Sequence, residues 1–162
     1  MKRVLVLGST GLIGRQFETL LKDKAEVIGA SFNHPENPVD LSKPESLKAL
    51  FEKVGKVDAI FCTAGVANLA PWADAPDSEW EFGINNKMMG QINTIRFGEK
   101  YVKDNGVIVL TTGILAQHPF QGSGIVTTVN AAVEAAIKAA VTEIDRIRIN
   151  AVSPGWLSLI HI

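Results

Sequence analysis

A turn with three glycines, Gly8-Ser9-Thr10-Gly11-Leu12-Ile13-Gly14, governs how this chain can fold. It follows a short β-branched run at 4–7 and opens a stretch at 12–21 whose apolar residues recur at helical spacing. In such a strand–turn–helix unit the first glycine permits a tight turn, the second lets the backbone approach a pyrophosphate, and the third lets helix and strand pack closely. The free N–H groups at the start of the helix then face the phosphates. The segment predicts a dinucleotide-binding turn; the alternative is a glycine-rich turn without a ligand.

Apolar runs of strand length alternate with helical periodicity along the rest of the chain. The run at 107–110 has no polar interruption, which is typical of a strand covered on both faces. This alternation predicts a doubly wound parallel sheet with helices on both faces, in a single α/β domain at 1–155. The expected strands are 4–7, 26–30, 57–63, 107–112 and 147–152, and the expected helices are 12–21, 47–54, 88–102 and 126–144.

The helix at 47–54 carries signals for both of its ends. Its apolar residues follow the i, i+3, i+4, i+7 pattern of one helical face. Ser42 lies three residues before Glu45, which is the spacing of a capping box, and Gly55 follows the last periodic residue as a C-cap does.

One connection is too short for the predicted topology. About seven residues separate Ser31, at the end of the second strand, from a further strand candidate at 39–41, whereas a parallel crossover generally takes about ten to twelve or more. Two alternatives stay open: the helix expected there is absent, or 39–41 pairs only marginally with the sheet.

Composition excludes several classes of partner. Sixteen basic residues against seventeen acidic ones give a formal charge of -1, which argues against the basic field needed for nucleic acid or anionic membranes. No apolar stretch approaches a membrane span of about 18–20 residues, and a single cysteine, Cys62, makes an internal disulfide impossible. We expect a cytoplasmic protein that binds neither nucleic acid nor membrane and holds no metal.

The segment after the second strand bears on the choice of dinucleotide. An acidic residue about twenty positions beyond the glycine turn would hydrogen-bond an unphosphorylated ribose. Ser31-Phe32-Asn33-His34 contains no acid, while Ser31, Asn33 and His34 can donate to a 2′-phosphate. The segment favours NADP(H) over NAD(H); the alternative is a polar loop after a strand.

Five further motifs, taken in chain order with the glycine turn, resemble the short-chain dehydrogenase/reductase family over residues 2–155. The last of them, at 149–155, is the most specific, because it resembles the strand and Pro-Gly turn that hold the nicotinamide in that family. The motifs are Asp40-Leu41, Ala64-Gly65 preceded by Cys62 and Thr63 in place of two asparagines, Asn85 or Asn86, Asn130-Ala131-Ala132-Val133-Glu134-Ala135, and Ile149-Asn150-Ala151-Val152-Ser153-Pro154-Gly155.

The resemblance implies a Rossmann-like fold, a nicotinamide cofactor and reversible hydride transfer at a small carbonyl or alcohol. It also implies a set of cofactor contacts along the carboxyl ends of the strands. These are Gly8, Thr10, Gly11, Leu12, Ile13, Gly14, Ser31, Asn33, Asp40, Leu41, Ala64, Gly65, Asn130, Pro154 and Gly155.

The chain departs from the family at its catalytic residues. The family uses a tyrosine as proton donor, a lysine four residues later that lowers the pKa of the tyrosine, and a serine that holds the substrate oxygen. Alignment on the motif at 130–135 places Val126 at the tyrosine position and Asn130 at the lysine position, one helical turn apart on one face. The serine position falls at Thr111-Thr112, where Thr112 would orient a substrate oxygen; the alternative is a plain strand-end threonine.

Lys87 is the candidate for the missing positive charge. It adjoins Asn86 at the start of the helix that borders the active site in the family, and the predicted catalytic set is therefore Thr112, Lys87 and Asn86. The alternative is a solvated helix lysine. The only tyrosine, Tyr101, is expected at an amphipathic surface position, and His118 is either a proton donor near the substrate or a surface residue.

Seven residues, 156–162, follow the Pro-Gly turn, and we expect them to be a truncated or artefactual tail. The family continues with substrate-binding helices and a further strand, which this chain is expected to lack. Family members form dimers, and the helices at 88–102 and 126–144 are the candidate homodimer surface.

The sequence thus predicts an NADP(H)-dependent oxidoreductase of the short-chain dehydrogenase/reductase type. Two alternatives remain: a nucleotide-binding module that has lost hydride transfer, and a fragment of a longer reductase with neither activity.

Overall fold

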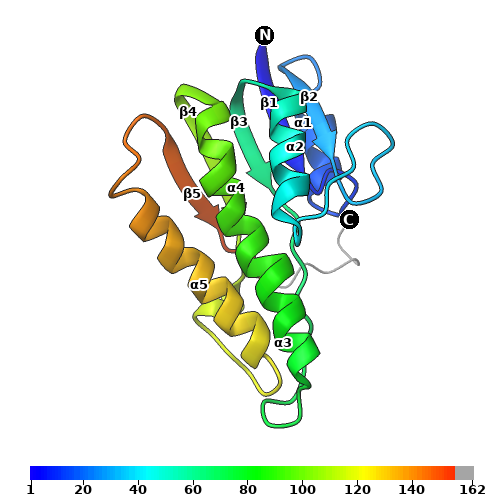
Figure 1. Ribbon diagram of the computed structural model, residues 1–162, viewed down its shortest axis with the longest axis vertical. Helices are drawn as coiled ribbons and strands as arrows, with labels where there is room; N and C mark the ends of the chain where they lie inside the picture. Colours follow the sequence, from blue (N-terminus) through cyan, green and yellow to red (C-terminus); the bar gives the residue numbers. More distant parts are fainter. Residues whose placement is uncertain (156–162) are drawn as a thin grey trace.

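The apolar runs form five parallel strands in one sheet (Figure 1). In the computed structural model, which describes residues 1–155, the strand order is β2-β1-β3-β4-β5. The predicted doubly wound parallel sheet is confirmed, and the tail predicted at 156–162 lies outside the described residues. The strands are β1 (Lys2–Leu7), β2 (Ala25–Ala30), β3 (Val57–Cys62), β4 (Val102–Thr111) and β5 (Arg148–Val152).

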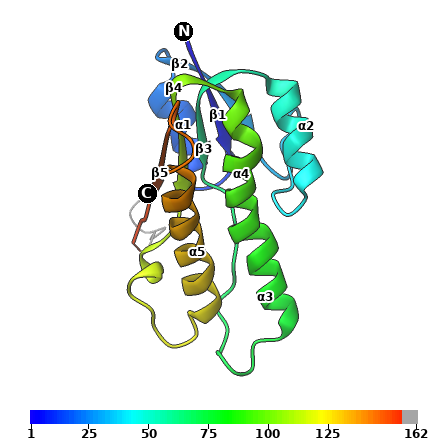
Figure 2. The ribbon, with the colours of Figure 1, turned by 60° about the vertical axis from the view of Figure 1, so that its left-hand side comes forward.

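Helices cover the two faces of the sheet unequally. Figure 2 shows α1 on one face and α2, α4 and α5 on the other. Within residues 1–155, no helix combines the length and the apolar content that a membrane span requires. The helical elements are α1 (Gly14–Leu21), α2 (Pro44–Val54), α3 (Asp77–Gly83), the π-helix η1 (Ile84–Met89), α4 (Gly90–Gly98), the 3₁₀-helices η2 (Glu99–Tyr101) and η3 (Ile114–Ala116), and α5 (Gly124–Ala140).

Strand β1 is buried on both faces, which explains its apolar sequence. Leu5 and Leu7 lie in the larger core, beneath α2, α4 and α5. Val4 and Val6 lie in a smaller cluster on the opposite face, against α1. There the ring of Phe17 packs on that of Phe61, from β3, with ring centroids 4.5 Å apart. Packing on both faces places the glycine turn at the carboxyl edge of a rigid strand.

The helix predicted at 88–102 begins much earlier than expected. The segments α3, η1, α4 and η2 follow one another without a break from Asp77 to Tyr101. The sequence does contain a signal for this earlier start. Pro76 is the N-cap, and Asp77 and Glu79 are acidic residues in the first turn, where they interact favourably with the helix dipole. Helices α1 and α2 end where expected, and their starts and both ends of α5 differ from the expected positions by two to four residues, as helix ends usually do.

The capping box predicted at Ser42 and Glu45 is wrong. Helix α2 begins at Pro44 with Lys43 as its N-cap, and no side chain caps it. Proline at the first helical position is already set for the helix, and the Ser42 hydroxyl donates instead to Asp40 Oδ1 at 2.6 Å. The C-cap is confirmed, because Gly55 has a φ of 70° and its N–H donates to the carbonyl oxygen of Phe51.

The short connection after β2 resolves as marginal pairing without a helix. Ser31 and Pro38 form one isolated parallel bridge, and the Val39 N–H donates to the Ser31 carbonyl oxygen at 3.0 Å. Val39 and Leu41 are buried in the larger core although they belong to no strand. The segment at 39–41 therefore packs into the larger core just beyond the end of β2 and forms no sixth strand.

Candidate functional site

The glycine turn brings the start of α1 close to the ends of β1 and β3. Gly8 has a φ of 87°, and a Cβ there would lie 2.8 Å from the Ala64 nitrogen. A Cβ on Gly14 would lie 2.1 Å from the Gly8 carbonyl oxygen, so only glycine permits this approach. No side chain caps the start of α1 and its first turn carries no acidic residue. Gly11, Arg15 and Gln16 donate their N–H groups to carbonyl oxygens of the turn, so among the described residues the amides at 12–14 are the ones available to an anion.

Two cavities lie side by side along the carboxyl ends of the strands and share Gly65 and Val66 in their linings. The smaller, of about 130 Å³, extends from the glycine turn to the end of β2. The larger, of about 360 Å³, lies between the ends of β3 and β4 and the start of α5. Of the predicted site residues, the smaller cavity is lined by Gly8, Ser31, Asp40, Leu41, Ala64, Gly65 and Asn86, and the larger by Ile13, Gly65, Lys87, Thr112, Asn130, Pro154 and Gly155.

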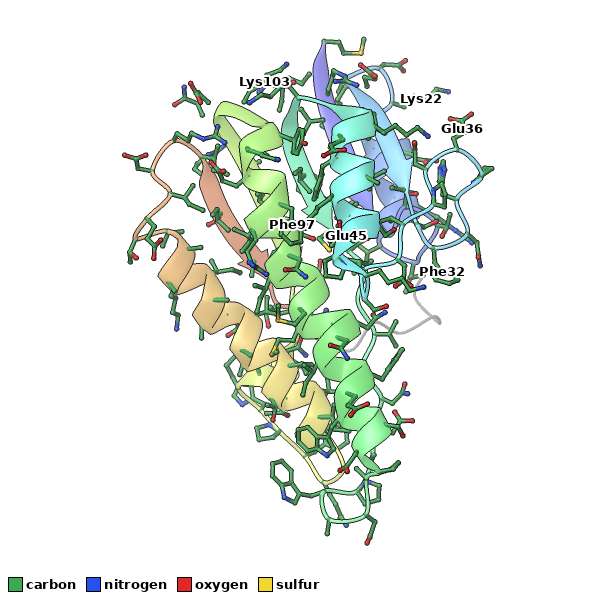
Figure 3. All side chains as sticks on the ribbon, in the orientation of Figure 1. Lys22, Phe32, Glu36, Glu45, Phe97 and Lys103 are labelled. Atoms are coloured by element: carbon green, nitrogen blue, oxygen red, sulfur yellow. The ribbon has the colours of Figure 1, made fainter. Side chains whose placement is uncertain are left out.

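Five predicted cofactor residues line neither cavity: Thr10, Gly11, Leu12, Gly14 and Asn33. Four of them belong to the glycine turn, where backbone rather than side chains is expected to make the contacts. Asn33 lies exposed in the loop after β2, beside Phe32, whose side chain is 69% exposed (Figure 3).

Unpartnered polar atoms gather near the smaller cavity. The hydroxyls of Ser9 and Ser31 are buried and, among the described residues, have no hydrogen-bond partner. His34 Nδ1 accepts from the N–H groups of Glu36 and Asn37, which leaves the proton of a neutral ring on Nε2. A Cβ on Gly29 would lie 2.7 Å from Ser9 Oγ and 3.2 Å from His34 Nε2, so these two donors lie near the same point.

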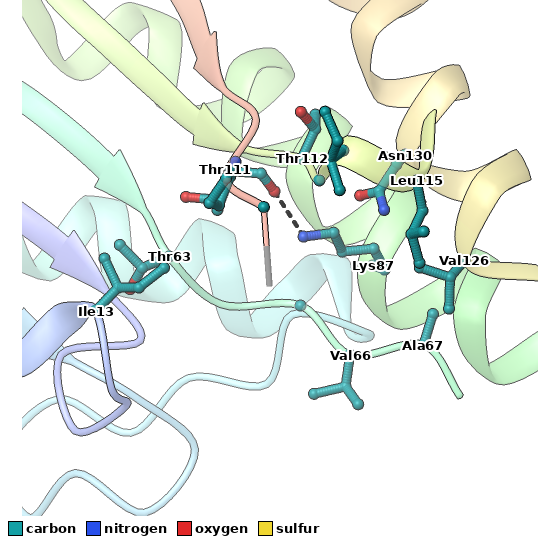
Figure 4. Close-up of a pocket in the computed structure, with 15 residues that line it drawn as sticks. Ile13, Thr63, Val66, Ala67, Lys87, Thr111, Thr112, Leu115, Val126 and Asn130 are labelled. Atoms are coloured by element: carbon teal, nitrogen blue, oxygen red, sulfur yellow. Dashed lines mark hydrogen bonds between the residues drawn. The ribbon is translucent and has the colours of Figure 1, made fainter. Parts of the chain in front are cut away.

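Lys87 is buried in the larger cavity, so the alternative of a solvated lysine is wrong. The residue is 8% exposed, and Nζ donates to the Thr111 carbonyl oxygen at 2.6 Å (Figure 4). Gln91, one turn later, donates through Nε2 to the same carbonyl oxygen and to that of Ala64. A Cβ on Gly65 would lie 2.8 Å from Lys87 Cδ, so the glycine makes room for the lysine.

Burial lowers the pKa of the Lys87 ammonium below its ordinary value, because the charged form loses its hydration. A negative charge on Cys62 would act in the opposite direction, but burial raises the pKa of that thiol. Cys62 is fully buried in β3 and behaves as a small apolar residue.

Asn86, rather than Asn85, is the asparagine at the site. Asn85 is exposed, whereas Asn86 lines the smaller cavity and its Oδ1 accepts the Val66 N–H at 2.7 Å. Asn86 thereby fixes the loop that separates the two cavities.

Thr112 is held by a residue that the sequence did not single out. Its hydroxyl donates to Glu134 Oε1 at 3.0 Å, and Gln117 donates to Glu134 Oε2 at 2.6 Å. Glu134 lies one turn after Asn130 on α5, and that spacing is the signal that could have revealed it. Glu134 therefore orients Thr112 at the wall of the larger cavity.

Val126 and Asn130, which the sequence predicts at the family's tyrosine and lysine positions, both line the larger cavity. Val126 presents an apolar side chain there, and Asn130 is buried with an Oδ1 that has no partner among the described residues (Figure 4). Tyr101 lies elsewhere, half-buried rather than at the surface, with its ring stacked on Phe51 at 5.8 Å between centroids. His118 is exposed and lines neither cavity.

The sequence matches, over residues 10–159, the profile of a family described as enoyl-(acyl carrier protein) reductase. Among solved structures, the protein lin1944 from Listeria innocua is 36% identical, with a TM-score of 0.93, over 98% of this chain and 80% of that one. The chain belongs to the short-chain dehydrogenase/reductase family. A small-chain dehydrogenase solved in complex with NADPH is 30% identical, with a TM-score of 0.89, over 95% of this chain and 70% of that one.

A curated member of the family, short-chain dehydrogenase/reductase ATR9 from Stachybotrys chlorohalonatus, is 29% identical over 130 residues, which are 72% of this chain. The chain spans 48% to 63% of the length of the curated relatives it matches. Membership of the short-chain dehydrogenase/reductase family accounts for the sheet, the glycine turn and the two adjoining cavities.

The lowered pKa of Lys87 predicts a pH-dependent stability. The unfolded chain keeps the ordinary value of 10.5, so between the lowered folded pKa and 10.5 the unfolded state binds more protons than the folded state. The free energy of unfolding contributed by this group therefore increases with pH across that window. Lys87→Met removes the contribution, and we expect its stability advantage over the natural protein to shrink as pH rises.

Urea denaturation from neutral pH to about pH 10 measures the difference. Lys138→Met, at an exposed position of α5, is the control and should differ from the natural protein by a constant amount. A pH-independent difference for Lys87→Met would contradict the burial of a titrating amine.

Proposed function

We propose that the protein is an NADP(H)-dependent oxidoreductase that transfers hydride to a small carbonyl compound or from the corresponding alcohol. The pair of adjoining cavities along the carboxyl ends of the strands carries the proposal. In open parallel sheets, ligands bind in the crevice outside these strand ends. The smaller cavity would take the adenosine half of the cofactor and the larger one the nicotinamide half, with the pyrophosphate at the start of α1.

The residues present fit such a cofactor. The uncapped start of α1 suits the pyrophosphate. Asn130 Oδ1, buried and without a partner among the described residues, is an acceptor for a ribose hydroxyl beside the larger cavity. Buried polar atoms normally find a partner, so these orphaned groups support a polar ligand.

The end of β2 favours the phosphorylated cofactor. Ser31 lines the smaller cavity with an unpartnered hydroxyl, and the same segment carries a second donor, His34 Nε2, which lies near Gly29. No acidic residue at 31–34 is available to accept from a free ribose 2′-hydroxyl. The related small-chain dehydrogenase solved with NADPH supports the same choice.

Lys87 is the group best placed to exchange a proton with the substrate oxygen. A bound NADPH supplies the hydride. Lys87 is the one ionisable side chain in the described lining of the larger cavity, and its lowered pKa moves it toward the range in which an acid–base group works best. Thr112 lines the same cavity, and its hydroxyl, which donates its proton to Glu134, can accept a hydrogen bond from the hydroxyl of an alcohol substrate.

A cofactor-binding module without turnover is the second candidate. Val126 lines the larger cavity at the position of the family's proton donor and cannot exchange a proton. If Lys87 does not replace that donor, binding remains without hydride transfer.

Cofactor binding is tested by titration with NADPH, followed by its fluorescence. Gly11→Val should weaken NADPH binding by about tenfold or more, because its side chain obstructs the approach of the pyrophosphate to the turn. Ala49→Val, on the exposed surface of α2, adds similar bulk and should leave affinity unchanged.

The same titration with NADH tests the choice of cofactor, and NADPH should bind more tightly. Unchanged NADPH affinity in Gly11→Val would contradict the placement of the pyrophosphate. Equal affinity for NADH and NADPH would contradict the role of the segment after β2.

Turnover is tested by following NADPH oxidation with a panel of small aldehydes, ketones and quinones. The natural protein should oxidise NADPH, and Lys87→Met should reduce kcat by about a hundredfold at unchanged NADPH affinity, because a proton donor is lost. Lys138→Met should retain full activity. Saturable NADPH binding without oxidation on any substrate would leave the binding module as the function.

A further inference from the structure

The Lys87 side chain is buried at the larger cavity, whereas lysines are mostly exposed. It lies in the π-helix η1, and Figure 4 shows its side chain directed toward the end of β4, where Nζ meets the Thr111 carbonyl oxygen. That carbonyl oxygen also accepts from Gln91 Nε2 at 2.8 Å. The carbonyl therefore keeps a donor when the amine turns away, so Lys87 is free to react.

No acidic group compensates the charge of Lys87. Within residues 1–155 it takes part in no ion pair, and the cavity lining contains no carboxylate. The walls that surround it are largely apolar, including Val66, Ala67, Leu115 and Val126. A desolvated amine in an apolar pocket keeps a larger neutral fraction, and the neutral amine is a nucleophile.

We propose that Lys87 is a nucleophilic lysine that captures small uncharged aldehydes in the larger cavity as a covalent imine. The nitrogen lone pair attacks the carbonyl carbon and forms a carbon–nitrogen bond, and a proton passes from nitrogen to the former carbonyl oxygen. The resulting hydroxyl then leaves with the second amine proton as water, and a carbon–nitrogen double bond remains. The reaction consumes one amine and one aldehyde and needs no oxidant, reductant or cofactor.

The hydrogen bond to Thr111 is compatible with this step. A neutral amine has two N–H groups and one lone pair, so an N–H donated at 2.6 Å leaves the lone pair available. The titratable group that acts on Lys87 is Cys62, from β3, and its own pKa is raised by burial, so it stays a neutral thiol near neutral pH. The volume of about 360 Å³ and the apolar walls select a small aldehyde without charge.

The experiment uses the full chain without cofactor, so a failure of hydride transfer cannot affect it. Propanal is added near neutral pH with sodium cyanoborohydride, which reduces an imine to a stable propyl adduct, and peptides are mapped by mass spectrometry over time. We expect the Lys87 peptide to carry most of the first adduct, ahead of exposed lysines such as Lys48 and Lys138. Lys87→Met should lose this early adduct, whereas Lys138→Met should keep it.

Unfolding provides a control that needs no variant. In urea the cavity is lost, and Lys87 should react no faster than the exposed lysines. Adduct that forms on Lys48 and Lys138 before Lys87 in the folded protein would overturn the proposal. Equal preference for Lys87 in folded and unfolded protein would also overturn it, because reactivity would then owe nothing to the cavity.

Discussion

The close backbone approach at Gly8 and Gly14 constrains the site more than any other contact. A side chain at Gly14 would overlap the Gly8 carbonyl oxygen, and one at Gly8 would overlap the start of the segment after β3. Because both positions lack a side chain, the start of α1 lies beside the ends of β1 and β3. The two cavities open along this edge, and the uncapped helix start faces them. The chain's membership of the short-chain dehydrogenase/reductase family rests on the profile match and on its similarity to a solved relative.

Much of the fold could be predicted from periodicity, because both faces of the sheet are buried. An apolar run such as β1 fits a strand that is covered on both faces. The C-cap at Gly55 could be predicted because the residue there has a positive φ, which glycine adopts readily. The errors arose where two local signals compete. Ser42 has the spacing of a capping box, yet Pro44 starts the helix and Asp40 takes the Ser42 hydroxyl.

The site could be predicted less completely, since burial depends on tertiary contacts. The sequence placed Lys87 near the site but left open that it was solvated, and only packing against Gly65 and Thr111 shows it buried. The role of Glu134 depends on its contact with Thr112, across 22 positions of the chain. The sequence predicts Val126 and Asn130 at the family's tyrosine and lysine positions, but the unpartnered oxygen of Asn130 could not be predicted, because it depends on tertiary contacts.

A crystal structure of the protein with NADP⁺ is the most direct measurement of the central claim, the binding of a dinucleotide across the glycine turn. We expect the pyrophosphate at the first amides of α1, the adenosine in the cavity bounded by Ser31 and Leu41, and the nicotinamide in the cavity that contains Lys87. Side chains filling that crevice, or the dinucleotide bound at another surface, would contradict it.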